Sequence, residues 1–447
     1  AILYEMHIGT FTNEGTFDAA AQKLNYLREL GVTHVELMPV NEFSGSRGWG
    51  YDGVDLYAPH QSYGGPDGLK RFVDACHRHG LAAILDVVYN HLGPVGNYLS
   101  RLGDYFSHQY TTPWGPAVNL DGPGSQEVRR FFCDNALMWL RDYHFDGLRL
   151  DAVHAFLDRS AIHFLEQLAM EVRELGRSLG RKLILIAESD LNNPRVVGPL
   201  ETGGLGMDAQ WSDDFHHALH AVLSGERTGY YADFGSMADL AKALSRVFVY
   251  DGCYSEHRAR RHGRPVEGLP AHRFIAALQN HDQIGNRAQG DRLHHLVSPG
   301  RARVGAGLLL LAPFVPLLFQ GEEFAASSPF QYFTNHDDPQ VGVAVSEGRR
   351  GEFAAFGWNP EEVPDPQREA TFQRSKLHWE EINEESHAAM LRWYKELIHL
   401  RKSTPDLMNG DLQSLQIESS EQLPWLIMHR GRMTVACNLA KESLSLT

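Results

Sequence analysis

Gly147-Leu148-Arg149-Leu150-Asp151 is a short, mostly apolar run that ends in a carboxylate, and several runs of this kind occur along the sequence. Between them lie longer segments in which apolar residues recur every three or four positions. Short strands that alternate with helices are typical of βα units around a parallel sheet. We therefore expect an α/β fold.

Eight runs have the length and composition of a strand, and eight is the number of strands in a (β/α)8 TIM barrel. Alternation by itself does not distinguish a closed barrel from a doubly wound open sheet, so the open sheet is the alternative. The strand count favours the barrel. The expected strands span residues 3–9, 34–39, 82–88, 147–151, 183–188, 207–211, 274–279 and 316–319.

Three connections are much longer than a barrel needs, including a long insertion after the third strand. All three follow the carboxyl end of a strand, and in TIM barrels those loops form the active-site face. A shorter connection, residues 17–30, has helical period and stops before Gly31, a residue suited to a helix C-terminus. The three long connections are residues 91–124, 212–273 and 321–384.

The last part of the chain has a different pattern. After a helix at about 386–402, two short alternating strands follow at 425–429 and 433–438. A chain of 447 residues also exceeds what one hydrophobic core usually serves. The expected division is a catalytic barrel at 1–403, with 91–124 as an inserted subdomain, and a small C-terminal β domain at 404–447.

The composition excludes several kinds of partner. With 41 Lys and Arg against 56 Asp and Glu, the formal net charge is −15, which repels nucleic acid phosphates and anionic lipid. The longest apolar stretch, 304–319, is interrupted by glycines and prolines and is too short to span a membrane. We expect neither nucleic acid nor a membrane as partner and, with no charged-then-apolar leader at the first residue, a cytoplasmic location.

The four cysteines are scattered and form no CxxC pair. This spacing indicates neither a zinc site nor a disulfide framework. The four are expected to be buried thiols, and they are Cys76, Cys133, Cys253 and Cys437.

Four expected strands end in, or run directly into, ionisable residues: His91, Asp151, Glu188 and Asp282. At any single position, such a residue could be a solvated strand end or a helix N-cap with no further role. Four together indicate a functional site, because like charges crowded at a barrel mouth cost stability unless function requires them.

Glycoside hydrolysis requires two carboxyl groups, one to protonate the leaving oxygen and one to attack the sugar or to activate water. Asp151 and Glu188 fit these roles. Arg149 lies two residues before Asp151 on the same strand face and can keep Asp151 ionised, or it can serve as a structural ion pair inside the barrel. Desolvation and the charge of Asp282 are expected to raise the pKa of Glu188, as a general acid requires.

Histidines and aromatic residues at the expected barrel mouth suit sugar binding. His91 and His281 can donate hydrogen bonds to sugar hydroxyls, and the rings of Tyr51 and Trp211 can stack on the apolar faces of pyranose rings. The alternative for each is an ordinary structural position in the core.

Four segments resemble, in order, motifs of the α-amylase family of glycoside hydrolases, and the likeness covers nearly the whole chain. It implies a covalent β-glycosyl intermediate on Asp151, proton transfer by Glu188, and stabilisation by Asp282 together with Arg149, His91 and His281. It also implies that Tyr51 stacks on the sugar in subsite −1. The segments are Asp-Val-Val-Tyr-Asn-His at 86–91, Gly-Leu-Arg-Leu-Asp-Ala-Val-His at 147–154, Ile-Ala-Glu-Ser at 186–189 and Gln-Asn-His-Asp-Gln at 279–283.

Within that family the chain resembles the branch that releases trehalose from maltooligosyl trehalose by hydrolysing the α-1,4 bond next to the terminal trehalose unit. The resemblance rests on residues 3–12, 48–54, 207–217, 280–287 and 321–324, of which Trp-Ser-Asp-Asp-Phe-His-His at 211–217 is the most diagnostic. Such a leaving group requires recognition beyond the general acid. The candidate residues are His154, Trp211, Asp213, Asp214 and Glu323, and Gln283 is a further residue expected to bind the substrate.

Two departures from the family pattern carry expectations of their own. Relatives usually have a β-sandwich before the barrel, whereas this sequence begins in the first strand, so that module is expected to be absent. Many members bind calcium with an Asn at the position of Asn90 and a His at the position of Ala155. Alanine offers no side-chain ligand, so we expect no metal, and no other cofactor either.

Other functions stay open at this point. A glycogen branching enzyme would transfer the glycosyl group to a 6-hydroxyl instead of water, and an ordinary α-amylase would cut linear amylose. A catalytically silent glucan-binding scaffold could also use the same barrel. The presence of three carboxylates, at Asp151, Glu188 and Asp282, speaks against the scaffold.

Overall fold

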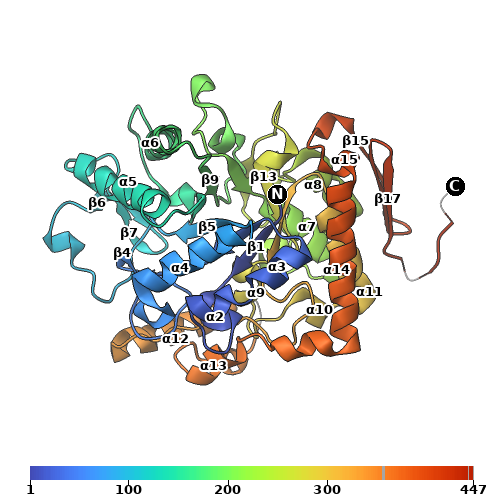
Figure 1. Ribbon diagram of the computed structural model, residues 1–447. Helices are drawn as coiled ribbons and strands as arrows, with labels where there is room; N and C mark the ends of the chain where they lie inside the picture. Colours follow the sequence, from blue (N-terminus) through green and yellow to red (C-terminus); the bar gives the residue numbers. More distant parts are fainter. Residues whose placement is uncertain (355–357, 441, 446–447) are drawn as a thin grey trace.

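In the computed structural model, which describes residues 1–354, 358–440 and 442–445, eight parallel strands close into a barrel (Figure 1). The first strand is hydrogen-bonded to the second on one side and to the last on the other, so this sheet has no edge and the open-sheet alternative is wrong. The predicted TIM barrel is confirmed. Its strands are β1 (Leu3–Met6), β2 (His34–Leu37), β5 (Ala82–Val87), β8 (Gly147–Leu150), β9 (Ile184–Ala187), β10 (Ala209–Trp211), β13 (Phe274–Ala277) and β14 (Val315–Phe319).

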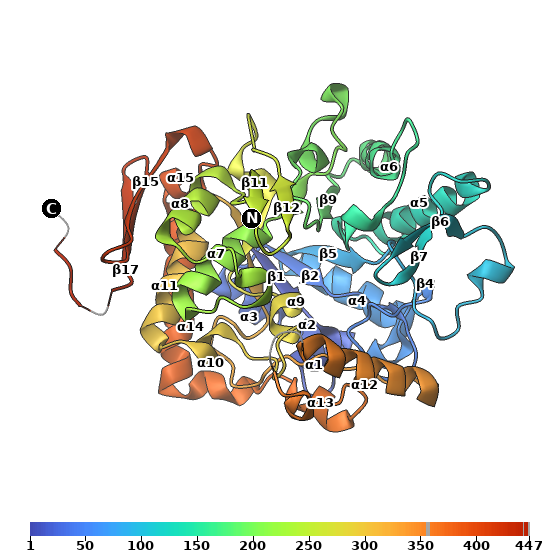
Figure 2. The ribbon, with the colours of Figure 1, turned by 180° about the vertical axis from the view of Figure 1, so that it is seen from behind.

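Helices cover the outside of the barrel (Figures 1 and 2). The segment expected as one helix at 17–30 is divided into α2 (Phe17–Ala21) and α3 (Leu24–Leu30), because α2 packs against α4 (Gly65–Arg78) whereas α3 packs against α14 (Glu385–Ser403). Gly31 ends α3 with a φ of 103°, as the sequence indicates. The other long helices include α5 (Ser125–Arg141), α6 (Phe164–Leu179), α7 (Asp213–Ser224), α8 (Met237–Arg246) and α11 (Pro299–Leu311).

The inside of the barrel has an apolar layer and a charged layer. Side chains alternate between the two faces of a strand, so residues two positions apart point the same way. The apolar layer includes Leu3 and Ile84, and the residues two positions further along these strands are Glu5 and Asp86. Glu5 pairs in register with Glu36, and Asp86 with Arg149. The strand register therefore gathers four charged residues at one level near the carboxyl ends of the strands.

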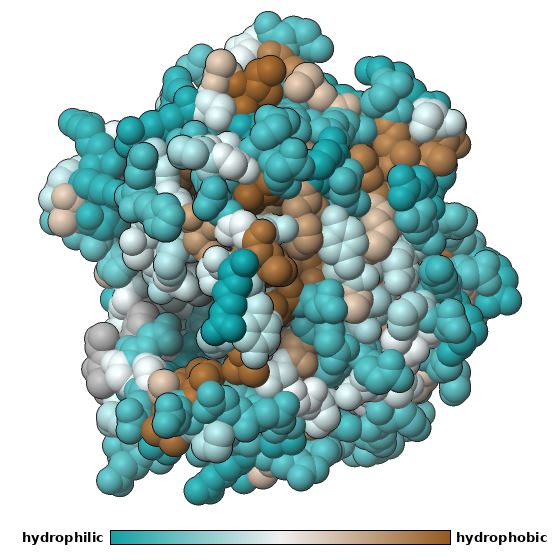
Figure 3. All heavy atoms as spheres, turned by 90° about the vertical axis from the view of Figure 1, so that its left-hand side faces the viewer, coloured by the Kyte–Doolittle hydropathy of each residue, from teal (hydrophilic) through white to brown (hydrophobic). Residues whose placement is uncertain are grey.

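The long connections at the carboxyl ends of the strands contain structure of their own. The first carries the hairpin β6 (Phe106–Thr112) and β7 (Gly115–Val118), and the second carries β11 (Asp251–Ser255) and β12 (Arg260–Gly263). The third carries α12 (Pro339–Ala354). Figure 3 looks at the side of the molecule on which β6, β7 and α12 lie in Figure 1; this face is mostly hydrophilic and is hollowed near its middle.

The chain ends in a three-stranded antiparallel sheet beside α8 and α14 (Figure 1). The two expected strands are present as β16 (Trp425–Arg430) and β17 (Met433–Asn438). A third, β15 (Leu415–Ser420), was missed because four of its six residues are polar, which obscures the alternation. The small C-terminal β-sheet is confirmed, while the division of the chain at residue 404 stays a prediction.

Two further observations concern the described part of the chain. No helix in it is long and apolar enough to cross a membrane. The four cysteines are free thiols, three of them buried and Cys253 half-buried.

A glycine inside the barrel provides a test of how tightly the strands pack. A methyl group at Gly147 would lie 2.4 Å from Ile184 Cγ1 and 2.6 Å from the Ile184 carbonyl oxygen. Gly147→Ala should therefore lower the free energy of unfolding by about 1–3 kcal/mol, as overpacking does. The measurement is urea unfolding followed by circular dichroism.

Gly307→Ala is the matched control, because a methyl group at this position of α11 meets nothing within 4 Å. The same substitution in an uncrowded helix should stabilise by about 0.5–1 kcal/mol. Equal stability of the two variants would contradict the tight packing at β8.

Candidate active site

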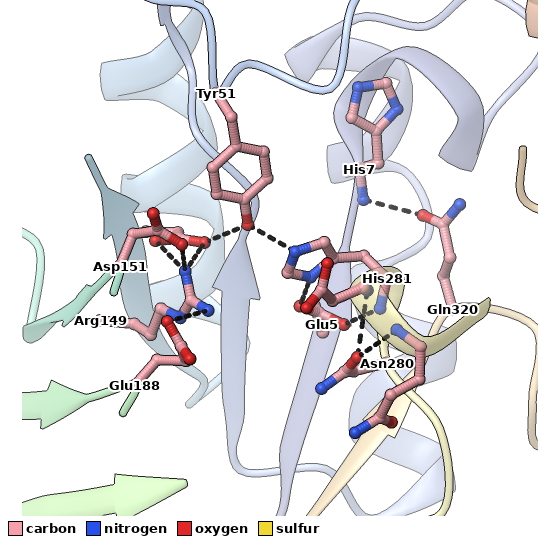
Figure 4. Close-up of polar contacts among 12 residues, drawn as sticks. Glu5, His7, Tyr51, Arg149, Asp151, Glu188, Asn280, His281 and Gln320 are labelled. Carbon is pink, nitrogen blue, oxygen red and sulfur yellow. Dashed lines mark hydrogen bonds and ion pairs between the residues drawn. The ribbon is translucent and has the colours of Figure 1, made fainter. Parts of the chain in front are cut away.

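A single guanidinium group lies at the centre of the charged layer. Nη1 of Arg149 donates to both carboxylate oxygens of Asp86, at 2.9 and 2.8 Å, and to Oδ1 of Asp151 at 2.9 Å. Nη2 lies 3.8 Å from Oε2 of Glu188 (Figure 4). The Arg149 side chain is 2% exposed, so its charge is balanced inside the protein. One buried cation thus joins three carboxyl groups.

Backbone contacts place Asp151 and Glu188 at the ends of neighbouring strands. The Asp151 N–H donates to the Val87 carbonyl at 3.1 Å, and the Glu188 N–H donates to the Leu150 carbonyl at 3.0 Å. The backbone turns at Ala152, where φ is 41°, and the Ala152 N–H donates to Oε2 of Glu188 at 2.6 Å. The two carboxyl groups are therefore fixed by the continuing strand ladder and not by flexible loops.

The pKa of Glu188 lies well above its usual range. Burial is the largest cause, and the charges of Asp151 and Asp213 add to it, while Arg149 and the Ala152 N–H oppose it. The sequence led us to expect Asp282 as the neighbouring charge, but the stronger effects come from Asp151 and Asp213. Glu188 is therefore suited to carry a proton at neutral pH.

A chain of hydrogen bonds leads from this cluster to the opposite wall of the barrel (Figure 4). The Tyr51 hydroxyl donates to Oδ2 of Asp86 at 2.6 Å and meets Nε2 of His281 at 2.8 Å. On the far side of the ring, Nδ1 of His281 lies 2.5 Å from Oε1 of Glu5. Because the hydroxyl proton of Tyr51 is given to Asp86, its oxygen accepts from Nε2, and Nδ1 then donates to Glu5.

The two ring nitrogens of His281 therefore both carry protons. Burial lowers the pKa of His281, but the ion pair with Glu5 outweighs burial and leaves that pKa raised. Both nitrogens contact other side chains in this structure, so His281 holds Tyr51 in place, and its role in sugar binding stays a prediction.

The third predicted carboxylate stands apart from the guanidinium cluster. Asp282 is exposed and lies in the first turn of α9 (His281–Gly285). The Asn280 side chain caps this helix by accepting from the N–H groups of Asp282 and Gln283, both at 3.0 Å. Nδ2 of Asn286 donates to Oδ1 of Asp282 at 2.7 Å. The carboxylate thus faces solvent at the barrel mouth with one oxygen held by Asn286.

His91 and its neighbours line another side of the mouth. Nε2 of His91 is 3.1 Å from the carbonyl oxygen of Tyr51, and its ring stacks on Trp114 with 5.2 Å between ring centroids. Burial lowers the pKa of His91, so its ring is neutral at pH 7. His91 therefore supports the backbone that carries Tyr51.

Three of the residues predicted to bind the substrate lie close to Glu188 or to one another. Asp213 begins α7, and Nε2 of Gln283 donates to its Oδ1 at 3.4 Å. Burial, followed by the charges of Asp282 and Asp214, raises the pKa of Asp213 to about 7. His154 is half-buried and follows Val153, whose N–H donates to the Glu188 carbonyl at 2.9 Å.

Three other residues predicted to bind substrate are buried and contact the protein itself, and their role in binding stays a prediction. Trp211 is 5% exposed and packs inside the barrel under Arg149, with the guanidinium carbon 4.4 Å from the ring centroid. Oδ2 of Asp214 accepts from the backbone N–H groups of Val249 and Tyr250 at 2.7 and 2.8 Å.

Glu323 is the third of these residues. It is fully buried, and its Oε1 accepts from the hydroxyls of Tyr4 at 3.1 Å and Tyr26 at 2.9 Å. These three side chains are therefore turned into the protein by strand parity and helix packing, and each has a structural partner there.

Sequence reasoning missed several residues of the cluster. Asp86 lies within one of the family motifs but is not among the residues predicted for the site, although a carboxylate inside an apolar strand is a recognisable signal. Glu5 and Glu36 give the same signal in their strands. Glu36 is buried, and burial followed by the charge of Glu5 raises its pKa well above the usual range. Asn286 gave no such signal, because its role depends on a contact one helical turn away.

Metal binding has no visible basis in the part of the chain that the structure describes. No group of three or more His, Cys, Asp or Glu side chains there could hold a metal ion. The absence of a calcium site stays a prediction.

Comparisons with known proteins point to one family. A family model described as the catalytic domain of alpha amylase matches residues 7–114. Two relatives, both named malto-oligosyltrehalose trehalohydrolase, match almost the whole chain. The protein of Mycobacterium tuberculosis is 51% identical, and the match covers 99% of this chain and 76% of the relative. The protein of Rhizobium sp. (strain M-11) is 52% identical, and the match covers 100% of this chain and 75% of the relative. A 1,4-alpha-glucan branching enzyme of Corynebacterium jeikeium is 36% identical, over 48% of this chain and 33% of its own.

A solved structure points to the same family. A provisionally assigned alpha amylase from Salmonella typhimurium superposes with a TM-score of 0.92 at 42% identity, covering 100% of this chain and 77% of its own.

Asp213→Asn should move the alkaline limb of the pH–activity profile to lower pH. Asp213, with its own pKa at about 7, is charged on the alkaline side, and there its charge raises the pKa of Glu188. Without that charge Glu188 loses its proton at a lower pH, and general acid catalysis fails earlier as pH rises. The measurement is kcat/KM against pH on a soluble α-glucan.

Asp74→Asn is the control for charge removal, because Asp74 is an exposed acid on the outer helix α4, paired with Arg78 at 3.2 Å. Its profile should match that of the unaltered protein. If Asp213→Asn also left the alkaline limb in place, the electrostatic link to Glu188 would be refuted.

Proposed function

The chain belongs to the malto-oligosyltrehalose trehalohydrolases, a branch of the α-amylase family of glycoside hydrolases, and we propose that it hydrolyses the α-1,4-glucosidic bond that joins a maltooligosaccharide to a terminal trehalose unit. The observation that carries the chemistry is the pair of carboxyl groups, Asp151 and Glu188, on one buried guanidinium. The identity of the leaving group rests on the relatives.

In the first step, a carboxylate oxygen of Asp151 forms a bond to the anomeric carbon while the bond from that carbon to the glycosidic oxygen breaks. Glu188 gives its proton to the departing oxygen, which leaves as a hydroxyl group of trehalose. The raised pKa of Glu188 supports this role, and the hydrogen bond from Arg149 to Asp151 supports an ionised nucleophile.

In the second step, water enters where trehalose has left. Glu188, now ionised, takes a proton from this water, whose oxygen attacks the anomeric carbon as the ester bond to Asp151 breaks. Two displacements retain the α configuration. Retaining enzymes keep the two carboxyl groups about 5–5.5 Å apart, and binding to neighbouring nitrogens of one guanidinium holds Asp151 and Glu188 close together.

The remaining residues act on the sugar that carries the developing positive charge. Asp282 stabilises the transition state, since an exposed carboxylate at the mouth can meet the sugar once water is displaced. The Tyr51 ring supports the apolar face of the same sugar, held by Asp86 and His281. His154, Asp213 and Gln283 are the candidates that remain for recognising trehalose.

A cytoplasmic location forms part of this proposal, because free thiols suit a reducing compartment. The substrate partner is maltooligosyl trehalose or a related α-glucan.

Incubation with maltotriosyl trehalose should release free trehalose and maltotriose, with the α-anomer of maltotriose appearing first in proton NMR spectra. A branching enzyme would instead build branched glucan without free trehalose, and an ordinary α-amylase would cut linear amylose comparably well. Either outcome would contradict the proposed specificity, and the β-anomer appearing first would contradict retention.

Asp151→Asn should lower kcat by roughly 10⁴-fold or more, because it removes the nucleophile. Binding of maltotriosyl trehalose, measured by calorimetry, should persist, since the shape of the site is kept. Asp142→Asn is the control, as this exposed acid at the end of α5 pairs with Arg141 at 2.7 Å. Undiminished hydrolysis by Asp151→Asn would refute its role.

A further inference from the structure

Asp282 is held differently from the other two carboxyl groups of the site. Asp151 and Glu188 lie at the ends of barrel strands beside Arg149, whereas Asp282 is exposed in a short helix. Its side chain is contacted by the amide of Asn286, whose Nδ2 donates to Oδ1 at 2.7 Å. The direction in which this carboxylate points therefore depends on how the Asn286 amide is oriented.

The Asn286 amide is oriented by an arginine from a distant segment. Nη1 of Arg349 donates to Oδ1 of Asn286 at 2.9 Å, and Nη2 donates to the Gly285 carbonyl oxygen. If the amide were reversed, its NH2 group would face the guanidinium and its oxygen would face the Asp282 carboxylate. Both contacts would be repulsive, so Arg349 and Asp282 together select one orientation.

Arg349 is itself firmly placed. It lies on α12, in the connection that follows the last barrel strand, and its side chain is 10% exposed. The guanidinium carbon is 4.9 Å from the ring centroid of Tyr332, and Nη1 also lies 3.1 Å from Oε2 of Glu352. A planar guanidinium that lies over the Tyr332 ring and pairs with Glu352 at its edge can fix both the Gly285 carbonyl and the Asn286 amide, which a flexible lysine could not do.

We propose that Arg349 and Asn286 are positioning residues for the third carboxylate, so that the helix inserted after the last strand contributes to catalysis through Asp282. This inference rests on the proposed function, because it takes Asp282 as the group that stabilises the transition state. The guanidinium of Arg349 does not touch the sugar. It fixes the orientation of the Asn286 amide, and the amide in turn fixes the orientation of the Asp282 carboxylate.

Three variants test this chain of contacts from Arg349 through Asn286 to Asp282, which we call the relay. Arg349→Ala removes the orienting cation, and Asn286→Ala removes the donor to Asp282. Asn286→Asp keeps the size of the side chain and its contact with Arg349 but replaces the donor with a carboxylate that repels Asp282. Each should lower kcat on maltotriosyl trehalose by about 10- to 100-fold, the scale of loss for a group misplaced by about 1 Å, with KM little changed.

Two measurements separate this role from a structural one. The melting temperature of Asn286→Asp should stay close to that of the unaltered protein, since the new ion pair with Arg349 offsets the repulsion from Asp282. The double variant Arg349→Ala, Asn286→Ala should lose no more activity than the worse single variant, because both act through one carboxylate. Arg350→Ala, at an exposed neighbouring arginine of α12, should behave like the unaltered protein.

Failure of the relay can be distinguished from failure of the proposed function. If the unaltered protein cleaves only linear maltooligosaccharides, the trehalose assignment is wrong, and the relay is judged by the same kcat ratios on that substrate. If Asn286→Asp and Arg349→Ala both retain kcat within about twofold, the relay is overturned. The relay would also be overturned if the double variant lost kcat by the product of the two single losses. A raised KM together with a lowered melting temperature in the single variants would overturn it as well.

Discussion

The structure depends on a positive charge buried inside a barrel. An isolated guanidinium in the protein interior costs several kcal/mol, and only close carboxylates can offset that cost. Arg149 has three such partners, in Asp86, Asp151 and Glu188, and its lower face rests on the ring of Trp211. The strands must therefore close in the observed register, because a shift by one residue would turn these side chains out of the barrel.

The same arrangement separates the chemical roles of the two carboxyl groups. Asp151 accepts a hydrogen bond from Arg149 at 2.9 Å, whereas the nearest contact of Glu188 with the guanidinium is 3.8 Å. Burial and the neighbouring carboxylates Asp151 and Asp213 then keep a proton on Glu188. One acid with a raised pKa beside a second carboxyl group that accepts from a buried guanidinium is the pairing that glycoside hydrolysis requires.

The loops add what the barrel does not supply. Tyr51 is carried by a loop that is clamped against the connection after the last strand: Trp49 stacks on Phe330 with 5.3 Å between centroids and donates from Nε1 to the Gln331 carbonyl at 3.0 Å. Arg47 donates to Oδ1 of Asn335 at 3.0 Å. The connection that carries Arg349 is thus also the one that supports the Tyr51 loop, so Tyr51 and Asp282 both depend on contacts from one inserted segment.

The amino-acid sequence by itself determined the eight strands, the barrel, and Arg149, Asp151 and Glu188 as its charged centre. These follow from local properties of the sequence: apolar runs of strand length, a charged residue at a strand end, and side chains that alternate between the two faces of a strand. It did not determine that Trp211, Asp214 and Glu323 face the core, that the charges of Asp151 and Asp213 raise the pKa of Glu188, or that Asn286 contacts Asp282. Those contacts join residues from different strands, helices and insertions, and their geometry exists only once the barrel has closed and its register has brought distant segments within hydrogen-bonding distance.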